Sequence, residues 1–235
     1  MSAIYKRELR SYFSTSIGYI FIGIFLALSG AVFSYCTLQM GSESDPTLYF
    51  SLMLFGLVVI IPLLTMKLFS EERKMKTEQL LLTSPISLWG MVFAKFLAAY
   101  TMFAVTFLFS CFNFLILYGY GTPETAIIIG NVISILLVGQ AFVAIGVFVS
   151  ALTENQLIAA FGTIAILLAL LLVGFISNVV NFTPIRVVIN WISIFTRFTP
   201  FTYGEFSFSA IVYYASIAFL FLFLTVRVFE KRRWE

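Results

Sequence analysis

Six long apolar stretches constrain this chain more than any other feature of its sequence. In chain order they lie at 17–38, 49–66, 92–118, 127–150, 157–177 and 209–229. A bilayer core about 30 Å thick is crossed by about 20 apolar helical residues, so each stretch is long enough to span a membrane. With 61% apolar and 11% charged residues, the sequence predicts an all-α polytopic membrane protein. A single transmembrane domain, residues 1–235, leaves no room for a separate soluble domain.

The positions of Lys and Arg predict the orientation of these helices. Basic residues flank the stretches on one side: Lys6, Arg7, Arg10, Lys67, Arg73, Lys74, Lys76, Lys95, Arg227, Lys231, Arg232 and Arg233. The opposite loops hold only Arg186 and Arg197. Cytoplasmic loops carry the excess of positive charge, so both termini and the segment 67–91 are predicted to be cytoplasmic. Because the basic residues flank spans instead of forming a face, nucleic acid is not predicted as a partner.

Residues 1–15 show a helical pattern of their own. Apolar side chains recur at i, i+4, i+7 and i+8, namely Tyr5, Leu9, Tyr12 and Phe13. This spacing predicts a short amphipathic interface helix along the inner lipid headgroups, with Lys6, Arg7, Arg10 and Ser14 turned away. The alternative is a basic tail that only sets orientation. In either case the first apolar stretch is too long for a signal peptide, so we expect it to stay as the first helix.

The segment 178–208 is mostly apolar but is interrupted by Pro184, Pro200 and Gly204. It is too broken to cross the membrane and too apolar for a free loop. A pair of short helices re-entering the outer leaflet is expected here, provided that their free backbone groups face protein or water. An interfacial belt of aromatic residues is the alternative.

Several kinds of chemistry are missing from the sequence. There is no phosphate-binding G-x-x-x-x-G-K-[ST] motif and no His, and Cys36 and Cys111 both lie in apolar stretches. We therefore expect no catalytic residue, no metal and no cofactor bound by this chain. Asn113 and Gln140 are the strongest polar residues deep in the stretches, where an interhelical hydrogen bond is more expected than a substrate ligand. Energy for any transport must then come from outside this chain.

The segment Lys67–Ser87 carries seven charged side chains between two apolar stretches. Thr77 is a suitable N-cap, Glu78 would lie at the positive end of a helix dipole, and Ser84-Pro85 would end the helix. Between them stand three leucines, Leu80, Leu81 and Leu82. Exposed leucines on a polar loop predict a partner that covers them. An interfacial helix on the inner leaflet is the alternative.

A second short connection on the same side is the turn Thr153-Glu154-Asn155-Gln156. Glu154 and Asn155 are candidates for a second contact with the same partner. A bare hairpin turn is equally compatible with the spacing.

Taken together, these features resemble the membrane subunit of ABC-2 type exporters. The pattern E-E-R-x-x-x-T-E-x-L-L-L-T-x-P-I-S follows the second span, and the ends of the chain, 7–13, 17–21, 223–227 and 230–234, are similar to GldF-like permeases. Lys76 stands where such proteins commonly have Gly, and Ser16 where a Pro often begins the first span.

The resemblance implies partners and a location. It implies a bacterial inner membrane, a second permease subunit (identical or related) and two copies of a separate ABC ATPase that binds the ATP and Mg²⁺. The residues that match its ATPase-coupling helix are Glu71, Glu72, Thr77, Glu78, Leu80, Leu81, Leu82 and Pro85. Membrane lipid and an extracytoplasmic accessory protein complete the expected partners.

Three functions remain open at this point. The first is a permease that couples ATP hydrolysis by the separate ATPase to outward movement of an amphipathic or lipid-like substrate. The second is a non-transporting transmitter that passes ATPase-driven motion to extracytoplasmic partners. The third, an ATP-independent channel, is disfavoured by the uncharged spans.

Overall fold

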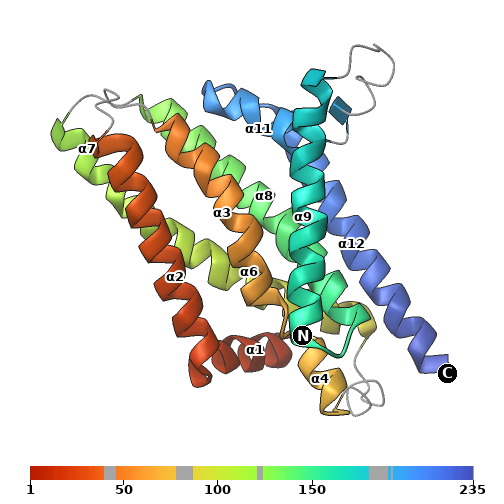
Figure 1. Cartoon of the computed structure of the whole chain (residues 1–235). Helices are drawn as coiled ribbons and strands as arrows, with labels where there is room; N and C mark the ends of the chain where they lie inside the picture. Colours follow the sequence, from red (N-terminus) through yellow and green to blue (C-terminus); the bar gives the residue numbers. More distant parts are fainter. Residues whose placement is uncertain (40–45, 78–86, 121–123, 180–189, 192, 235) are drawn as a thin grey trace.

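The computed structural model describes residues 1–39, 46–77, 87–120, 124–179, 190–191 and 193–234, and over these ranges it contains helices and no strand (Figure 1). The α-helices are, in chain order, α1 (Ser2–Ser14), α2 (Ser16–Phe33), α3 (Thr47–Thr65), α4 (Ser70–Lys74), α6 (Leu88–Ser110), α7 (Phe114–Tyr120), α8 (Thr125–Leu152), α9 (Gln156–Val179), α11 (Ile194–Thr202) and α12 (Phe208–Trp234). A π-helical turn, Ser34–Gln39, extends α2, and a 3₁₀ turn, Cys111–Asn113, joins α6 to α7.

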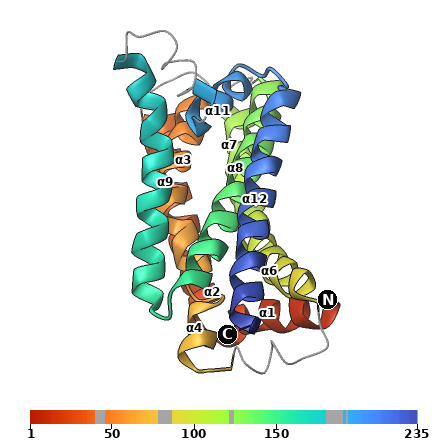
Figure 2. The same ribbon diagram turned by 90° about the vertical axis from the view of Figure 1, so that its right-hand side faces the viewer.

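Within the described ranges, six helical segments are long and apolar enough to cross a membrane, which confirms the predicted fold class. They are Ser16–Cys36, Thr47–Lys74, Leu88–Gly119, Thr125–Leu152, Gln156–Gly174 and Phe208–Arg233. The third segment begins four residues before its predicted start and therefore takes in a longer inner end. Both termini lie at the same end of the bundle, as an even number of crossings requires (Figures 1 and 2).

Helices α8 and α3 form the centre of the bundle. In the 18-residue apolar window of each candidate span, 67% of the residues are buried in α8 and 61% in the α3 segment, against 28% in the α2 segment. Gly146 of α8 lies so close to Thr65 of α3 that a Cβ there would overlap the threonine side chain, so a small residue is what permits this approach. Helix α12 packs along α8, and at its foot the Arg232 guanidinium donates to the carbonyl of Ala151 at 2.6 Å.

At the end opposite the termini, α11 lies across the bundle and packs on α8 and α9 (Figures 1 and 2). Its buried face consists of Ile194, Phe198 and Phe201, and the Ser193 hydroxyl caps its start by accepting from the Thr196 N–H at 3.1 Å. The predicted broken segment is thus helical over α11, while residues 180–189 and 192 lie outside the described residues. Whether α11 enters the lipid stays a prediction.

At the other end, α1 runs across the foot of the bundle (Figure 1). Thr15 alone separates it from α2, with an extended backbone (φ −107°, ψ 153°) that turns the chain through a corner. Gly18, in the first turn of α2, lies against the Tyr12 carbonyl, where a Cβ would overlap it. The sharp corner therefore depends on glycine at this position, and Ser16 occupies the first helical position, where Pro is also well accommodated.

Candidate functional site

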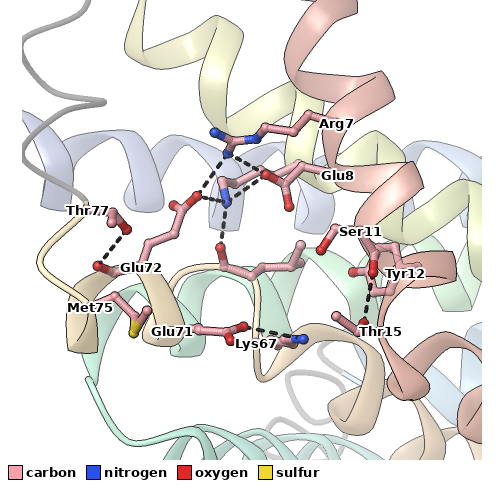
Figure 3. A pocket seen from close by; sticks show the side chains of 12 residues that line it. Arg7, Glu8, Ser11, Tyr12, Thr15, Lys67, Glu71, Glu72, Met75 and Thr77 are labelled. Carbon is pink, nitrogen blue, oxygen red and sulfur yellow. Dashed lines mark hydrogen bonds and ion pairs between the residues drawn. The ribbon is translucent and has the colours of Figure 1, made fainter.

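A pocket of about 330 Å³ opens at the foot of the bundle, between α1 and α4 (Figure 3). Its wall is unusually polar for this chain and consists of Arg7, Glu8, Ser11, Tyr12, Thr15, Lys67, Leu68, Glu71, Glu72, Met75, Thr77 and Lys95. These residues come from α1, from the connection between α3 and α4, from α4 and from α6. Three segments that are distant in sequence therefore meet here, within the region that the charge pattern indicated.

Lys95 of α6 is the central side chain of this site, and only 1% of it is exposed. Its ammonium lies 2.9 Å from Glu72 and 3.3 Å from Glu8, and it donates to the Leu68 carbonyl at 2.6 Å. The Phe69 ring lies 4.8 Å away and adds a cation–π contact. An ammonium has three N–H donors, so three acceptors satisfy it fully. A buried charge is tolerated only when it is paired in this way.

Arg7 completes the balance of charge around Lys95. Its guanidinium lies 2.6 Å from Glu8 and 3.0 Å from Glu72 (Figure 3). Burial alone would lower the pKa of Arg7, but the hydrogen bonds and charges of the two carboxylates outweigh it and raise that pKa above its ordinary value. We call Arg7, Glu8, Glu72 and Lys95 the ion cluster. One buried oxygen, Oε2 of Glu72, has no hydrogen-bond partner among the described residues.

The chain breaks its helix between α3 and α4, and α8 satisfies the backbone groups that this break frees. The Phe69 and Ser70 N–H groups donate to the Ser150 hydroxyl oxygen at 3.1 and 3.2 Å. Ser150 donates in turn to the Met66 carbonyl at 3.1 Å, to which the Ser70 hydroxyl also donates. The Leu68 carbonyl accepts a hydrogen bond from the Lys95 ammonium. Irregular backbone at this depth is tolerated because protein groups replace the missing helical bonds.

The two tyrosines of α1 face protein. Tyr12 is buried and its hydroxyl donates to the Leu64 carbonyl at 3.1 Å, while Tyr5 is half-buried and its hydroxyl donates to Thr101 at 3.2 Å. Burial raises the pKa of Tyr12, and the charge of Glu8 raises it further. The Tyr12 hydroxyl therefore stays protonated and serves as a fixed donor between α1 and α3.

The remaining side chains of α1 divide as an amphipathic helix should. On the predicted apolar face, Leu9 is half-buried and Phe13 is 44% exposed. The side chains predicted to turn away are all exposed: Lys6, Arg7, Arg10 and Ser14. The helix itself is confirmed over Ser2–Ser14. Its contact with lipid headgroups stays a prediction, and half of its apolar face serves to hold it to α3 and α6.

The structure places three of the predicted coupling residues around the pocket. Glu71 pairs with Lys67 at 3.5 Å, Glu72 belongs to the ion cluster, and the Thr77 hydroxyl donates to the Glu72 carbonyl at 3.2 Å. Thr77 was predicted as the N-cap of a following helix; here its side chain bonds back to α4. The other coupling residues lie outside the described residues: Glu78, Leu80, Leu81, Leu82 and Pro85.

Helix α4 ends in a Schellman motif. The Lys76 N–H donates to the Arg73 carbonyl at 3.1 Å and the Thr77 N–H to the Glu72 carbonyl at 3.0 Å. This pattern requires a left-handed residue between α4 and Thr77, and Lys76 takes it with φ +56°. A left-handed position, which Gly adopts without strain, is thus held here by Lys.

The turn between α8 and α9 lies beside α4. Arg73 pairs with Glu154 at 2.9 Å and also donates to the Leu152 carbonyl at 2.9 Å. The Asn155 side chain accepts from the Leu157 N–H at 2.9 Å and so caps the start of α9. The described start of the predicted coupling region, at α4, thus lies against the turn that holds the second candidate contact.

Sequence reasoning missed the roles of Glu8, Lys95 and Ser150. Lys95 was taken as a marker of orientation, and Glu8 was not assigned to either face of the interface helix. One signal was available: a lysine one turn or more inside an apolar helix needs a buried acceptor. Nothing in the sequence identified that acceptor, because Glu8 and Glu72 lie on segments far from Lys95.

The amide side chains in the described spans differ in burial and in their hydrogen bonds. Asn113 and Gln140 are half-buried, and neither makes an interhelical hydrogen bond among the described residues. Asn131 is the fully buried amide; it donates to the Ile127 carbonyl of its own helix at 2.8 Å, and its Oδ1 has no partner in the described ranges. Over the same ranges, no group of three or more His, Cys, Asp or Glu could hold a metal ion.

Comparison with known proteins now adds to this geometry. A search of curated proteins gave no match. The family described as ABC-2 family transporter protein matches residues 11–233, which is nearly the whole chain and includes every candidate span. The six apolar helices and this match agree, and the chain belongs to the ABC-2 family of transporter proteins.

Proposed function

We propose that this chain is the permease subunit of an ABC-2 type exporter, in which a separate ABC ATPase supplies the energy. The observation that carries the proposal is the family match over residues 11–233. In support, the charged segment, α1 and the α8–α9 turn gather at one end of a bundle whose spans are almost free of charge. That arrangement gives a soluble partner one surface to bind.

The finer parts of the proposal concern partners and place. Two ATPase subunits, which bind ATP and Mg²⁺, contact the coupling region 67–91 of two permease subunits, with Glu154 and Asn155 as the second contact. The permease lies in a bacterial inner membrane with both termini cytoplasmic, since Lys and Arg gather at that end. Its relation to the GldF-like branch rests on the sequence patterns at the two ends of the chain.

The substrate is proposed to be amphipathic or lipid-like. The ion pairs within the described spans lie at their inner ends, as in Lys67–Glu71 and Lys95–Glu72, so an ion or a strongly polar solute would find no charged ligands farther along these spans. A hydrophobic face of a lipid-like molecule is compatible with exposed apolar side chains along α9, such as Leu157, Phe161 and Leu172. Movement of the cargo would follow from closure of the two ATPase subunits against the coupling region.

Binding of the ATPase is tested with single substitutions in the leucine segment. We expect Leu81→Asp and Leu82→Asp to abolish co-purification of the ATPase subunit, because an aspartate in an apolar contact leaves a buried, unpaired charge. Membrane insertion should be unchanged. Arg233→Asp, an exposed charge reversal on α12, is the control and should retain the ATPase. Wild-type recovery of the ATPase with both leucine variants would rule out this contact.

Reconstitution in liposomes separates the permease from a transmitter. With the chain and its ATPase alone, a fluorescent phosphatidylethanolamine should change leaflet in an ATP-dependent manner, measured by quenching from outside. ATP hydrolysis without any movement of the lipid would favour the transmitter.

A further inference from the structure

The ion cluster joins three helices that the chain itself leaves hinged. Helix α1 meets its span through the single extended residue Thr15, and α4 meets its span through the break after α3. Neither connection is a continuous helix, so neither fixes the direction of the short helix by itself. Tyr12 and Tyr5 hold α1 to α3 and α6, and the contacts across the site are what link α1 directly to α4.

Those contacts are mainly ionic. The pocket of about 330 Å³ lies between α1 and α4, so apolar side chains do not fill this space. Across it run the pair from Arg7 of α1 to Glu72 of α4, at 3.0 Å, and the two pairs of Lys95, to Glu72 at 2.9 Å and to Glu8 at 3.3 Å. Each carboxylate thus bonds to both cations, and the cluster closes as a ring (Figure 3).

Burial strengthens the part of this ring that contains Lys95. Lys95 is 1% exposed and the side chains of Glu8 and Glu72 are 12% and 18% exposed, whereas Arg7 is 53% exposed. In such surroundings an ion pair is weakly screened, and loss of one partner leaves an uncompensated charge. The ring therefore favours one relative position of α1, α4 and the inner end of α6 over all others.

From this geometry we propose that the ion cluster makes α1, α4 and the inner end of α6 move as one unit, with Lys95 as its positioning residue. Under the proposed function, on which this use of the unit rests, a push by the ATPase on the coupling region reaches α4 first. The cluster then delivers the same displacement to the interface helix α1 and to the third span. Without the cluster, α4 would move while α1 stayed with α3 and α6, to which Tyr12 and Tyr5 bond it.

The unit is tested by measuring the distance between α1 and α4. Spin labels are placed at Ala3→Cys, far from the Thr15 corner, and at Met75→Cys, which is 69% exposed, after Cys36→Ala and Cys111→Ala. In lipid nanodiscs the parent protein should give one narrow distance distribution. When the ATPase is bound and trapped with ATP, Mg²⁺ and vanadate, that distribution should not change.

Glu72→Gln and Glu8→Gln each remove one charge of the ring and keep the side-chain volume. Either variant should broaden the distribution or add a second population of at least a third of the molecules. Glu71→Gln is the matched control, since Glu71 stands next in α4 but pairs with Lys67 outside the cluster. It should behave like the parent.

Two results would overturn the proposal. One is a parent-like distribution in both Glu72→Gln and Glu8→Gln; the other is a parent distribution that changes on nucleotide trapping. Failure of the proposed function is seen separately, as absence of any co-purifying ATPase. In that case the nanodisc measurement on the chain alone still decides whether the cluster holds α1 to α4.

Discussion

At the residue scale, the ends of α4 and α11 show the same motif made with different residues. Gly204 ends α11 with φ +73°, and its N–H and that of Glu205 bond to the carbonyls of Phe201 and Pro200, both at 3.1 Å. Lys76 does the same for α4 with φ +56°. A side chain in the left-handed region costs about 1–2 kcal/mol, which glycine avoids. Lys76 therefore holds a strained backbone conformation within the coupling region.

This strain gives a prediction for Lys76→Gly. The substitution should stabilise the end of α4 by about 1 kcal/mol, because the turn is kept and the strain is removed. Hydrogen exchange of the Thr77 amide, which donates to Glu72, should slow. Lys74→Gly is the control: Lys74 lies in the helix itself, so glycine should speed exchange at the same amide. Equal effects of the two substitutions would contradict this interpretation.

Single residues also set the limit of sequence reasoning. The exposed Lys6 and Arg10 follow directly from the 3.6-residue period of α1. Glu8 does not, because it lies on the protein side of a helix that the period divides only into apolar and polar faces. Its partner Lys95 belongs to another helix, and pairing across helices depends on tertiary packing. The pattern therefore predicted the helix and missed its strongest contact.

At the element scale, the break between α3 and α4 is held by a neighbouring helix. Ser150 of α8 accepts from two N–H groups and donates to one carbonyl at this break. The sequence predicted the apolar stretch 49–66 and its end correctly, since charge begins at Lys67. It did not predict that the helical segment continues to Lys74 through a break, because the hydroxyl that stabilises the break lies far along the chain.

Ser150→Ala should loosen this break. Backbone groups left buried without a partner cost about 1–3 kcal/mol each, so amides at Phe69 and Ser70 should exchange at least tenfold faster. Mass spectrometry of exchange in nanodiscs reports this region as one peptide. Ser216→Ala serves as the control, because the Ser216 hydroxyl is exposed and donates only to Val212 in its own helix. Unchanged protection at the break in Ser150→Ala would refute the role of this hydroxyl.

At the scale of the whole molecule, polarity divides the bundle into two unlike ends. One end carries α1, α4, both termini and the ion cluster; the other carries α11. The number and placement of the spans could be predicted from apolar length alone. Each span must by itself be long and apolar enough to cross the bilayer core and must satisfy its own backbone hydrogen bonds. How the spans pack could not be predicted, because apolar length does not say which spans are neighbours. That depends on close contacts at small residues such as Gly146.

The orientation gives a prediction for labelling. Met75 follows α4 and Tyr203 follows α11, two helices at opposite ends of the bundle, and these side chains are 69% and 74% exposed. In a chain without its native cysteines, Tyr203→Cys should react with an impermeant maleimide at the extracytoplasmic face. Met75→Cys should react only after the inner membrane is permeabilised. The reverse pattern would overturn the assignment of the termini to the cytoplasm.

The ring around Lys95 also bears on how this protein is made. Arg7 and Glu8 leave the ribosome early, Glu72 follows after two spans, and Lys95 arrives only with the third. Until then α1 lacks the pair between Glu8 and the buried Lys95 ammonium, and only Arg7 can link it to Glu72. Closure of the inner end is thus a late step of biogenesis, and a nascent chain that stops short of its third span should be cut by protease within its first fifteen residues.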